Sequence, residues 1–335
     1  MSDPALETLM LALDGGDFPR GEGLFLGARP HPALDGWKGL SGWQPLKPLA
    51  DSWEKAGHSG SAEPPGGRWP LVLFLPGKAR DEILHGFALA RDRLADGGVL
   101  LVSMANDEGA ARFEKELAAA TGGVTSIQKH KCRAFHVRND GVWDEARFEE
   151  WRQLGGFHPV PDTNHVTQAG VFSHGRVDAG SALLARHLPR GLSGKIADLG
   201  AGWGFLSAEL LSTSPGISRI DLYEADARAL ECARLNLASH SGCEIGFHWH
   251  DVTTGIGNGY DGVIMNPPFH RGSGTDLELG RDFLRAGAAA LRRGGRMFLV
   301  ANRQLAYESC LGELRMAWRK LAEDATYKVI AATAP

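Results

Sequence analysis

From residue 195 onward, the chain alternates strand-like and helix-like segments with a regularity that leaves few possible folds. Short runs of apolar and β-branched residues alternate with stretches whose apolar residues follow the helical period. This order is typical of a parallel sheet with helices on both faces, because each parallel crossover needs about a dozen or more residues. Strands are predicted at residues 195–199, 219–224, 244–250, 262–265, 297–301 and 327–331, and helices at 204–211, 227–239, 277–291 and 309–321.

A pattern shared by the two halves of the chain indicates an internal duplication. In the C-terminal half, the pair Gly294-Gly295 follows a helical pattern and precedes an apolar strand that ends before Asn302. In the N-terminal half, Gly97-Gly98 occupies the same place before an apolar strand and Asn106. A glycine pair after a helical pattern is typical of a left-handed helix stop. By the same comparison, residues 71–75 correspond to 263–265 and residues 24–27 to 196–200.

The length of the chain, 335 residues, exceeds what one hydrophobic core usually holds. Residues 151–167 contain glycine and proline and show no sustained period, so the boundary is predicted near residue 162. The expected fold is therefore α/β, with two tandem Rossmann-like domains at residues 1–161 and 162–335.

Composition and cysteine spacing exclude several classes of protein. Apolar residues make up 43% and charged residues 23%, as in globular rather than disordered chains. The apolar runs are far shorter than the roughly 20 residues that span a bilayer, and the N-terminus lacks the features of a secretory signal. The four cysteines have no metal-ligand spacing, so we expect reduced, structural cysteines, no metal and a cytoplasmic protein.

The charge distribution bears on nucleic-acid binding. A net charge of −4 argues against a protein that coats nucleic acid indiscriminately, but it allows a local basic face. Candidate basic patches are residues 129–133, the group Arg292, Arg293 and Arg296, and the pair His270-Arg271.

Three alternating glycines follow the first strand of the C-terminal half. Gly200, Gly202 and Gly204 stand where a strand turns into a helix, and they remove side chains where the backbone would approach a ligand closely. Asp198, at the end of the strand, could order this turn or reach the amino group of a bound amino acid. The spacing G-x-G-x-G differs from the G-x-G-x-x-G of dinucleotide sites, so it favours a nucleoside without a pyrophosphate.

Carboxylates stand at the ends of the next two strands. Glu224 follows the second strand and could accept hydrogen bonds from both hydroxyls of a ribose. Asp251 follows the third strand and could accept from an adenine amino group. Because the carboxyl ends of parallel strands meet at one edge of the sheet, the sequence predicts a nucleoside site there.

The N-terminal half lacks these glycines. At the corresponding place it has Gly27-Ala28-Arg29-Pro30, which cannot form the same turn, so we expect that this half has lost its ligand site. Residues 31–67 contain several glycine, proline and tryptophan residues and are predicted as a long irregular or surface-inserted segment.

The fourth strand ends in Asn266-Pro267-Pro268-Phe269, which predicts chemistry on an amine. An aryl amine is a weak nucleophile because its lone pair is delocalised into the ring. The side-chain oxygen of Asn266 and the backbone carbonyl of Pro267 could accept its two N–H bonds and direct the lone pair at a methyl donor. Phe269 offers a ring on which a base could stack, worth about 1–3 kcal/mol.

On these residues, the chain resembles the class I methyltransferases, and more closely the bacterial 16S rRNA guanine-N2 methyltransferases of the small ribosomal subunit. The resemblance implies S-adenosylmethionine as the donor and a guanine amino group in 16S rRNA as the target. It also implies a degenerate N-terminal methyltransferase copy, with an RNA-binding or structural role, and an active C-terminal copy. It rests on residues 69–78, 97–106, 131–133, 170–173, 178–184, 198–204, 266–270 and 300–302.

The resemblance also assigns residues before the glycine turn. Carried over by position, Phe172 to Ser173 and Asp178 to Ser181, which include Gly180, would form the approach to the methionine end of the cofactor. The segment His174-Gly175-Arg176 departs from the order usual in the family.

Other functions share part of this pattern. Asparagine-Pro-Pro motifs also serve adenine-N6 enzymes of DNA and glutamine methyltransferases of release factors, although Phe269 favours a nucleobase over a glutamine. A non-catalytic ribosome assembly factor is a further alternative, against which intact Asp198 and Asn266 argue. The expected partner is the small ribosomal subunit, and the expected state is a monomer.

Overall fold

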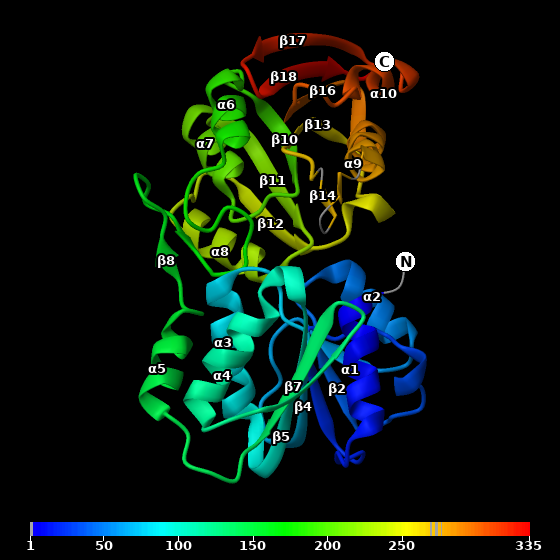
Figure 1. Cartoon of the computed structure of the whole chain (residues 1–335). Helices are drawn as coiled ribbons and strands as arrows, with labels where there is room; N and C mark the ends of the chain where they lie inside the picture. The colour runs from blue at the N-terminus through cyan, green and yellow to red at the C-terminus, as the bar shows by residue number, and fades with distance from the viewer. Residues whose placement is uncertain (1–2, 269, 272–273, 276) are drawn as a thin grey trace. The chain divides into compact units, whose positions relative to one another are not determined.

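The computed structural model describes residues 3–268, 270–271, 274–275 and 277–335. The chain divides into two compact units, Met1–Gly156 and Phe157–Pro335 (Figure 1). Each unit contains a seven-stranded sheet with helices on both faces, which confirms the α/β fold class with two tandem domains. The predicted boundary, residue 162, lies a short way inside the second unit.

The two sheets have the same strand order, β3-β2-β1-β4-β5-β7-β6 in the first and β12-β11-β10-β13-β16-β18-β17 in the second. In each, five strands run parallel and the last two pair antiparallel. The first sheet contains β1 (Gly23–Leu26), β2 (Leu40–Trp43), β3 (Ser59–Ser61), β4 (Trp69–Phe74), β5 (Leu94–Ala105), β6 (Thr125–Lys129) and β7 (Cys132–Arg138). The second contains β10 (Ser193–Leu199), β11 (Gly216–Glu224), β12 (Glu244–Trp249), β13 (Tyr260–Met265), β16 (Leu291–Asn302), β17 (Ala317–Glu323) and β18 (Tyr327–Thr333).

Two short hairpins, β8 (His158–Pro159) with β9 (Val166–Thr167) and β14 (His270–Arg271) with β15 (Gly274–Thr275), complete the strands described. The helices of the first unit are α1 (Pro4–Gly15), α2 (Lys47–Lys55), α3 (Arg80–Arg93), α4 (Ala110–Thr121) and α5 (Glu145–Gln153). Those of the second are α6 (Ala179–His187), α7 (Phe205–Thr213), α8 (Ala227–Leu237), α9 (Leu277–Ala290) and α10 (Tyr307–Glu313). Among the described residues, none of these helices is long and apolar enough to cross a membrane.

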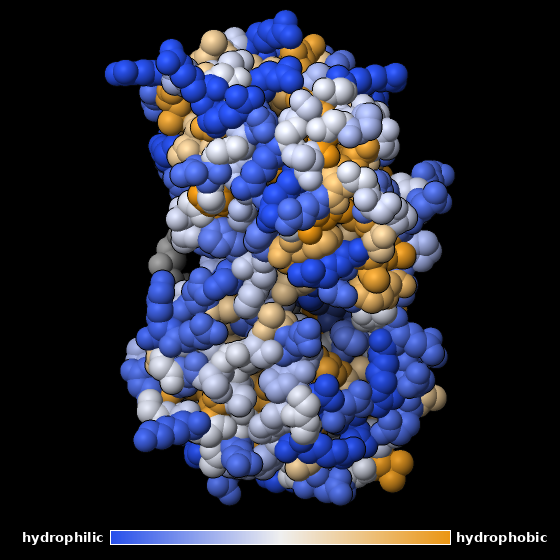
Figure 2. All heavy atoms as spheres, turned by 180° about the vertical axis from the view of Figure 1, so that it is seen from behind, coloured by the Kyte–Doolittle hydropathy of each residue, from blue (hydrophilic) through white to orange (hydrophobic). Residues whose placement is uncertain are grey.

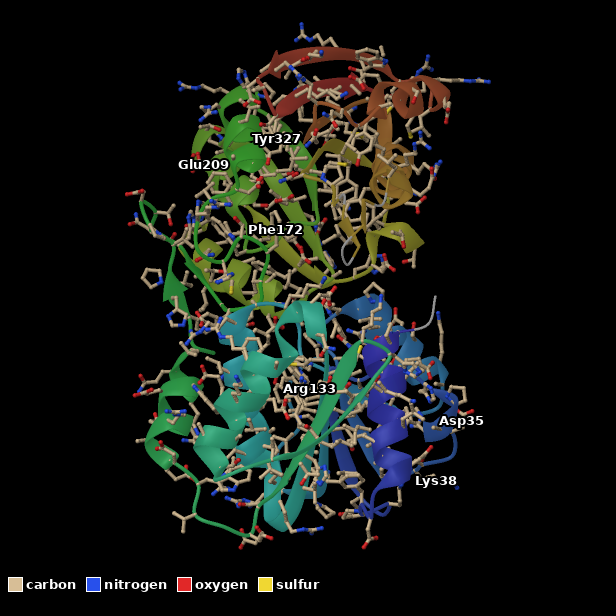
Figure 3. The ribbon with its side chains drawn as sticks, viewed as in Figure 1. Asp35, Lys38, Arg133, Phe172, Glu209 and Tyr327 are labelled. Carbon is tan, nitrogen blue, oxygen red and sulfur yellow. The ribbon has the colours of Figure 1, made fainter. Side chains whose placement is uncertain are left out.

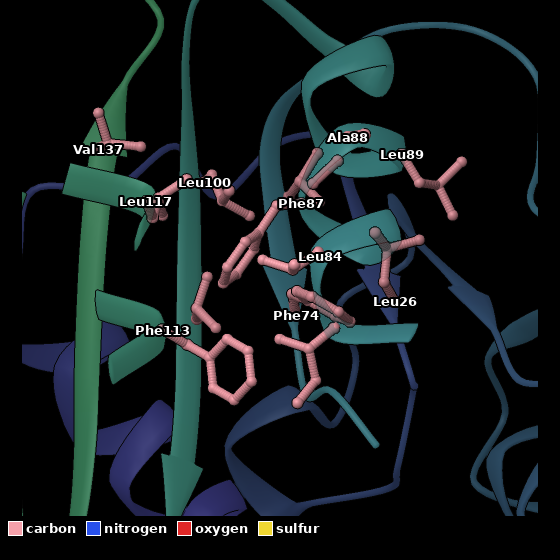
Figure 4. Close-up of a cluster of buried hydrophobic side chains, with 14 of the residues drawn as sticks. Leu26, Phe74, Leu84, Phe87, Ala88, Leu89, Leu100, Phe113, Leu117 and Val137 are labelled. Carbon is pink, nitrogen blue, oxygen red and sulfur yellow. The ribbon is translucent and has the colours of Figure 1, made fainter. Parts of the chain in front are cut away.

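Each sheet is buried on both faces, because successive side chains of a strand point to opposite sides. In β1, Leu24 and Leu26 join the cluster under α3, α4 and α5, whereas Phe25 joins the cluster under α1 and α2. Figure 4 shows Phe74 and Phe87 in the first of these clusters. In the second unit, α6, α7 and α8 cover one face and α9 and α10 the other. The helices thereby turn polar residues outward, and hydrophilic residues cover most of the surface in Figure 2.

The predicted duplication reappears in backbone hydrogen bonds. The N–H of Gly97 donates to the carbonyl of Asn139, and the N–H of Asn139 donates to the carbonyl of Gly98. Gly294-Gly295 exchanges the same two bonds with Ala334. Gly97 and Gly294 have nearly equal φ values of 71° and 72°. The prediction that these pairs stop helices is wrong, because α9 ends at Ala290 and both pairs lie in the irregular first part of a long strand.

A second shared feature is the turn after β1 in the first sheet and after β10 in the second. The N–H groups of Gly27-Ala28 both donate to the carbonyl of Trp43, and those of Gly200-Ala201 both donate to the carbonyl of Tyr223. The same backbone turn therefore bonds β1 to β2 and β10 to β11.

Two predictions made from periodicity are wrong. Residues 31–67 are not an irregular insertion but contain β2, α2 and β3, two strands of the first sheet and the helix between them. Strands of four and three residues are too short to show an alternating pattern. The helix predicted at 309–321 ends at Glu313, and Arg315, with a left-handed φ of 57°, precedes the edge strand β17. The other strands and helices predicted in the C-terminal half overlap those observed.

We expect Gly27→Ala to destabilise the first unit more than Gly36→Ala. Both glycines have a left-handed φ, 74° and 76°, which costs a residue with a Cβ about 1–2 kcal/mol. A Cβ at Gly27 would also lie 2.3 Å from the carbonyl oxygen of Leu75, whereas at Gly36 it would meet nothing within 4 Å. Urea unfolding followed by tryptophan fluorescence measures both losses, and equal losses would contradict the close approach of the two strands.

Candidate functional site

A pocket lies at the carboxyl ends of β10 and β13, beside the start of α6 and α7. Its cavity volume is about 50 Å³. Six predicted site residues line it, and Phe172 is labelled in Figure 3 on the loop before α6. The lining residues are Phe172, Ser173, Asp178, Ser181, Gly200, Ala201, Gly202, Trp203, Phe205, Leu206 and Asn266.

The glycine turn forms one wall of this pocket. Gly200, Gly202 and Gly204 all have left-handed φ values, 69°, 55° and 86°. A Cβ at Gly202 would meet nothing within 4 Å, so this backbone is open on the side of the pocket. Gly204 begins α7, and a Cβ there would lie 3.2 Å from Ala233, so it serves helix packing instead.

Glu224, at the end of β11, is partly buried beside the glycine turn. Its Oε2 accepts a hydrogen bond of 2.7 Å from the N–H of Gly202, and its Oε1 accepts one of 2.8 Å from the N–H of Asp226. Burial raises the pKa of this carboxyl to about 7, against the opposing effect of the two N–H groups. The carboxyl thus holds the turn in place and titrates near neutral pH.

Asp198 lies behind the turn and is fully buried. Its Oδ2 accepts a 2.7 Å hydrogen bond from the hydroxyl of Ser207, which connects the end of β10 to α7. Its Oδ1 is buried and has no partner in the part of the chain described here. Burial raises its pKa to about 7. Of the two roles predicted for Asp198, the contact with Ser207 corresponds to ordering the turn.

A second buried aspartate in the same sheet, Asp221, shows how several hydrogen-bond donors change the pKa of a buried carboxyl. Asp221 is 1% exposed, and its carboxylate accepts hydrogen bonds from Arg219, His248 and Tyr260. Although burial acts to raise its pKa, these donors lower it to about 2. The partners of Asp221 leave it ionised within a structural network, whereas Asp198 keeps one oxygen without a donor. An unpartnered buried oxygen beside an open glycine turn fits a site that a polar ligand completes.

Asn266, directly after β13, is held by two residues of α6. Its Nδ2 donates to Oδ2 of Asp178 and to the hydroxyl of Ser181, each at 2.9 Å. Asp178 is the N-cap of α6 and also accepts from the N–H of Ser181 at 2.8 Å. Because a carboxylate can only accept hydrogen bonds, Asp178 must face the NH2 group of the amide and not its oxygen. The amide oxygen of Asn266 is therefore left to accept from another group.

The other predicted residues are placed as follows. Gly180 packs under the ring of Tyr327, where a Cβ would come within 3.1 Å. Pro267 is buried, and Asp251 accepts from the N–H and hydroxyl of Thr253. Phe269 lies outside the described residues.

The two loop residues at the mouth of the pocket differ in their surroundings. Phe172 is 66% exposed, which is unusual for so large an apolar side chain. Ser173 has a left-handed φ of 57°, and its hydroxyl donates to the carbonyl of Arg176 at 2.7 Å. An exposed ring above the pocket is therefore in a position to cover a ligand.

Sequence reasoning missed the contact between Ser181 and Asn266. The two residues are far apart in the chain, and no spacing rule connects them. The rings of Trp203 and Phe205 pack against each other, with centroids 5.5 Å apart, and both residues also line the pocket.

Comparisons with known proteins agree on one family. Residues 162–331 match the family described as the methyltransferase small domain. The ribosomal RNA small subunit methyltransferase C of Pseudomonas paraeruginosa is 33% identical over 81% of this chain and 81% of its own length. That of Shewanella piezotolerans is 29% identical over 77% of this chain and 75% of its own.

Among solved structures, the chain is similar to a 16S rRNA N2 methyltransferase of T. thermophilus in complex with AdoMet and guanosine. The match has a TM-score of 0.82 with 24% sequence identity, and it covers 99% of this chain and 92% of the other. At this level of identity the match establishes the fold over both units.

We predict that Asp198→Asn alters how stability depends on pH. In the fold, Asp198 keeps its proton up to about pH 7, against an ordinary pKa of 3.8, so its contribution to stability is lost as pH rises between these values. An asparagine side chain does not titrate, so the Asp198→Asn variant does not lose stability in this way. The difference in melting temperature, variant minus wild type, should therefore increase from about pH 5 to about pH 8.

Glu209→Gln is the control, because Glu209 is an exposed carboxylate on α7, labelled in Figure 3. The exposed side chain contributes little to stability, so this variant should melt close to wild type. A difference between Asp198→Asn and wild type that does not change with pH would show that Asp198 is ionised in the fold.

Proposed function

Since the chain belongs to the ribosomal RNA small subunit methyltransferase C family, we propose that it methylates the exocyclic N2 amine of a guanine in 16S rRNA. It is an enzyme that uses S-adenosylmethionine as the methyl donor. The roles of individual residues, given next, belong to this proposal.

The observation that carries the catalytic assignment is the fixed orientation of the Asn266 amide. With its Nδ2 bound to Asp178 and Ser181, the amide presents Oδ1 as an acceptor. A guanine N2 amine has two N–H bonds to donate, and Oδ1 of Asn266 and the carbonyl of Pro267 accept them. The nitrogen lone pair then points out of the plane of the base and becomes nucleophilic.

We assign the cofactor to the pocket and to two carboxylates that are not among its lining residues, Glu224 and Asp251. S-adenosylmethionine supplies an electrophilic methyl group on a sulfonium. The carboxylate of Glu224 accepts from the ribose hydroxyls, Asp251 from the adenine amine, and the open backbone at Gly202 allows close approach. Phe172, Ser173 and Asp178 surround the methionine end. The chemistry requires no strong base, because the amine proton leaves to water after transfer.

Stacking of the target base on Phe269 remains a prediction from the sequence. Phe269 lies outside the described residues, and its role rests on its place directly after Asn266-Pro267-Pro268. An aromatic ring there would hold a base that has left its helix.

The first unit serves as a degenerate copy in this proposal. Gln44 stands at the end of β2, as Glu224 stands at the end of β11, but it is 3% exposed. Its Nε2 donates to the carbonyl of Ala28 at 2.9 Å, and its Oε1 accepts from the N–H of Leu46 at 3.1 Å. A buried amide in these contacts cannot accept from ribose hydroxyls, so each chain binds one cofactor molecule. The first unit then acts in RNA binding or in supporting the second.

The proposal also includes the oligomeric state of the enzyme, the particle on which it acts and its location. The enzyme acts as a monomer on the small ribosomal subunit in the cytoplasm, where 16S rRNA is assembled. No observation in the described residues favours the alternatives of a DNA amine, a protein glutamine or a non-catalytic assembly role.

We expect Asn266→Ala to lower methyl transfer by on the order of 100-fold or more, because the substrate amine loses one of its two acceptors. The dissociation constant of S-adenosylmethionine should stay within about twofold, because the cofactor is held elsewhere. The assay uses labelled donor with small subunits from a strain lacking this enzyme, followed by mass spectrometry of the labelled nucleoside.

Ser181→Ala is the graded comparison, since it removes one of the two acceptors of the Asn266 amide and leaves Asp178 in place. Its rate should lie between those of wild type and Asn266→Ala. An Asn266→Ala variant that methylates subunits as fast as wild type would exclude Asn266 from catalysis.

We expect cofactor affinity to depend on pH through Glu224. The group binds ribose as a carboxylate, and its pKa of about 7 means that it must lose a proton on binding in mildly acidic solution. Affinity should therefore rise with pH up to about 7 and level off above it, with a slope of at most tenfold per pH unit. Calorimetry on wild type and Glu224→Gln measures this, and the variant should bind weakly at every pH. The same pH profile in both proteins would count against the ribose role.

A further inference from the structure

A groove lies on the edge of the second sheet that is formed by β16, β18 and β17, away from the pocket described above. In Figure 1, β17 and β18 form the outer edge of this sheet, next to α6. One wall of the groove is the end of α6 with His187 and Pro189. The floor and the other wall come from the three strands, through residues that include Arg296, Phe298, Arg319 and Ala331.

The strand register places two arginines on the same face of this groove. Phe298 on β16 and Arg319 on β17 are both paired with Ala331 of β18, and paired residues project to one face. Arg296 lies two residues before Phe298 and so projects to that face as well. Its guanidinium carbon lies 5.7 Å from the centroid of the Phe298 ring. The floor is thus apolar and aromatic, and its rim is cationic.

The cations of the groove are not neutralised by the protein. Among the described residues, neither Arg296 nor Arg319 makes an ion pair, and no aspartate or glutamate lines the groove. Both arginines and His187 are exposed. Arg293 and Arg190, also exposed, flank the groove in the sequence and add to its charge. In a chain of net charge −4, an uncompensated cationic groove is a local exception.

We propose that this groove binds the phosphodiester backbone of the rRNA substrate at a distance from the reacting base. The proposal rests on the proposed function, which makes RNA the polyanion that the enzyme must hold. Arginines bind phosphate oxygens in a bidentate manner. Such contacts position an RNA without reading its sequence.

The position of the groove separates it from catalysis. Arg296 is level with Gly262 on β13, near the amino end of the sheet, whereas Asn266 follows the carboxyl end of that strand. Arg296 is four residues along the strand and one strand across from Asn266, roughly 14 Å. Arg319 is level with Ile264 and three strands across, roughly 16 Å from Asn266. The groove therefore holds a part of the RNA other than the target nucleotide, and it contributes affinity rather than chemistry.

The test compares two double variants with equal changes in charge. Arg296→Gln with Arg319→Gln removes the groove cations. Arg112→Gln with Arg234→Gln is the matched control, because both of these arginines also lie over phenylalanine rings, at 5.6 Å and 4.6 Å. Filter binding of full-length protein to purified 16S rRNA over a range of salt concentrations gives the affinity. Methylation of small subunits and calorimetry with S-adenosylmethionine give the activity and the state of the catalytic pocket.

The groove variant should bind 16S rRNA roughly tenfold more weakly than wild type. The slope of log affinity against log salt should fall by about 1.4 to 1.8, which corresponds to two lost phosphate contacts. Cofactor affinity and the rate at saturating subunit concentration should match wild type, and the control should retain most of the affinity.

Several results would overturn the proposal. One is unchanged affinity and salt slope in the groove variant, and another is an equal loss in the control. A wild-type dimer in sedimentation that the groove variant abolishes would assign the groove to a second copy of the chain instead. A wild-type enzyme that forms no N2-methylguanosine would refute the proposed function itself, which the methylation assay reports separately.

Discussion

The register of three parallel strands determines where this protein can do chemistry. Leu199 of β10 is paired with Tyr223 of β11 and with Met265 of β13. The next residue of each strand is therefore at the same level, and these residues are Gly200, Glu224 and Asn266. A slip of one residue would turn these side chains to the opposite face of the sheet. The backbone bonds from Gly200-Ala201 to Tyr223 hold the turn at this level.

Burial gives the acids around this turn their properties. Burial raises the pKa values of Glu224 and Asp198 to about 7, while the pKa of Asp221 is lowered to about 2. Asp221 differs from the other two by its donors, one of which is the charged guanidinium of Arg219. A buried carboxyl oxygen without a hydrogen-bond donor, such as Oδ1 of Asp198, raises the free energy of the protein without ligand. Hydrogen bonds from the polar groups of a ligand then offset that cost.

The two units share a backbone arrangement but differ in the side chains at their strand ends. Both have the same strand order, the same turn after β1 or β10 and the same glycine pair in the fifth strand. The side chains differ at the strand ends, where Gln44 stands in place of Glu224 and Leu75 in place of Asn266. Hydrogen bonds between backbone groups tolerate such replacements, whereas recognition of a nucleoside and an amine does not.

The sequence by itself determined the α/β class, the duplication, the glycine turn and the residues at the strand ends, because these depend on local periodicity and on chain order. It could not reveal β2 and β3, which are too short for a period, or β17, whose mostly exposed side chains leave no apolar stripe. Only the tertiary structure decided that Asp178 and Ser181 orient the Asn266 amide and that Arg296 and Arg319 share a face. These are contacts between residues far apart in the chain, and packing and strand register, rather than spacing, bring them together.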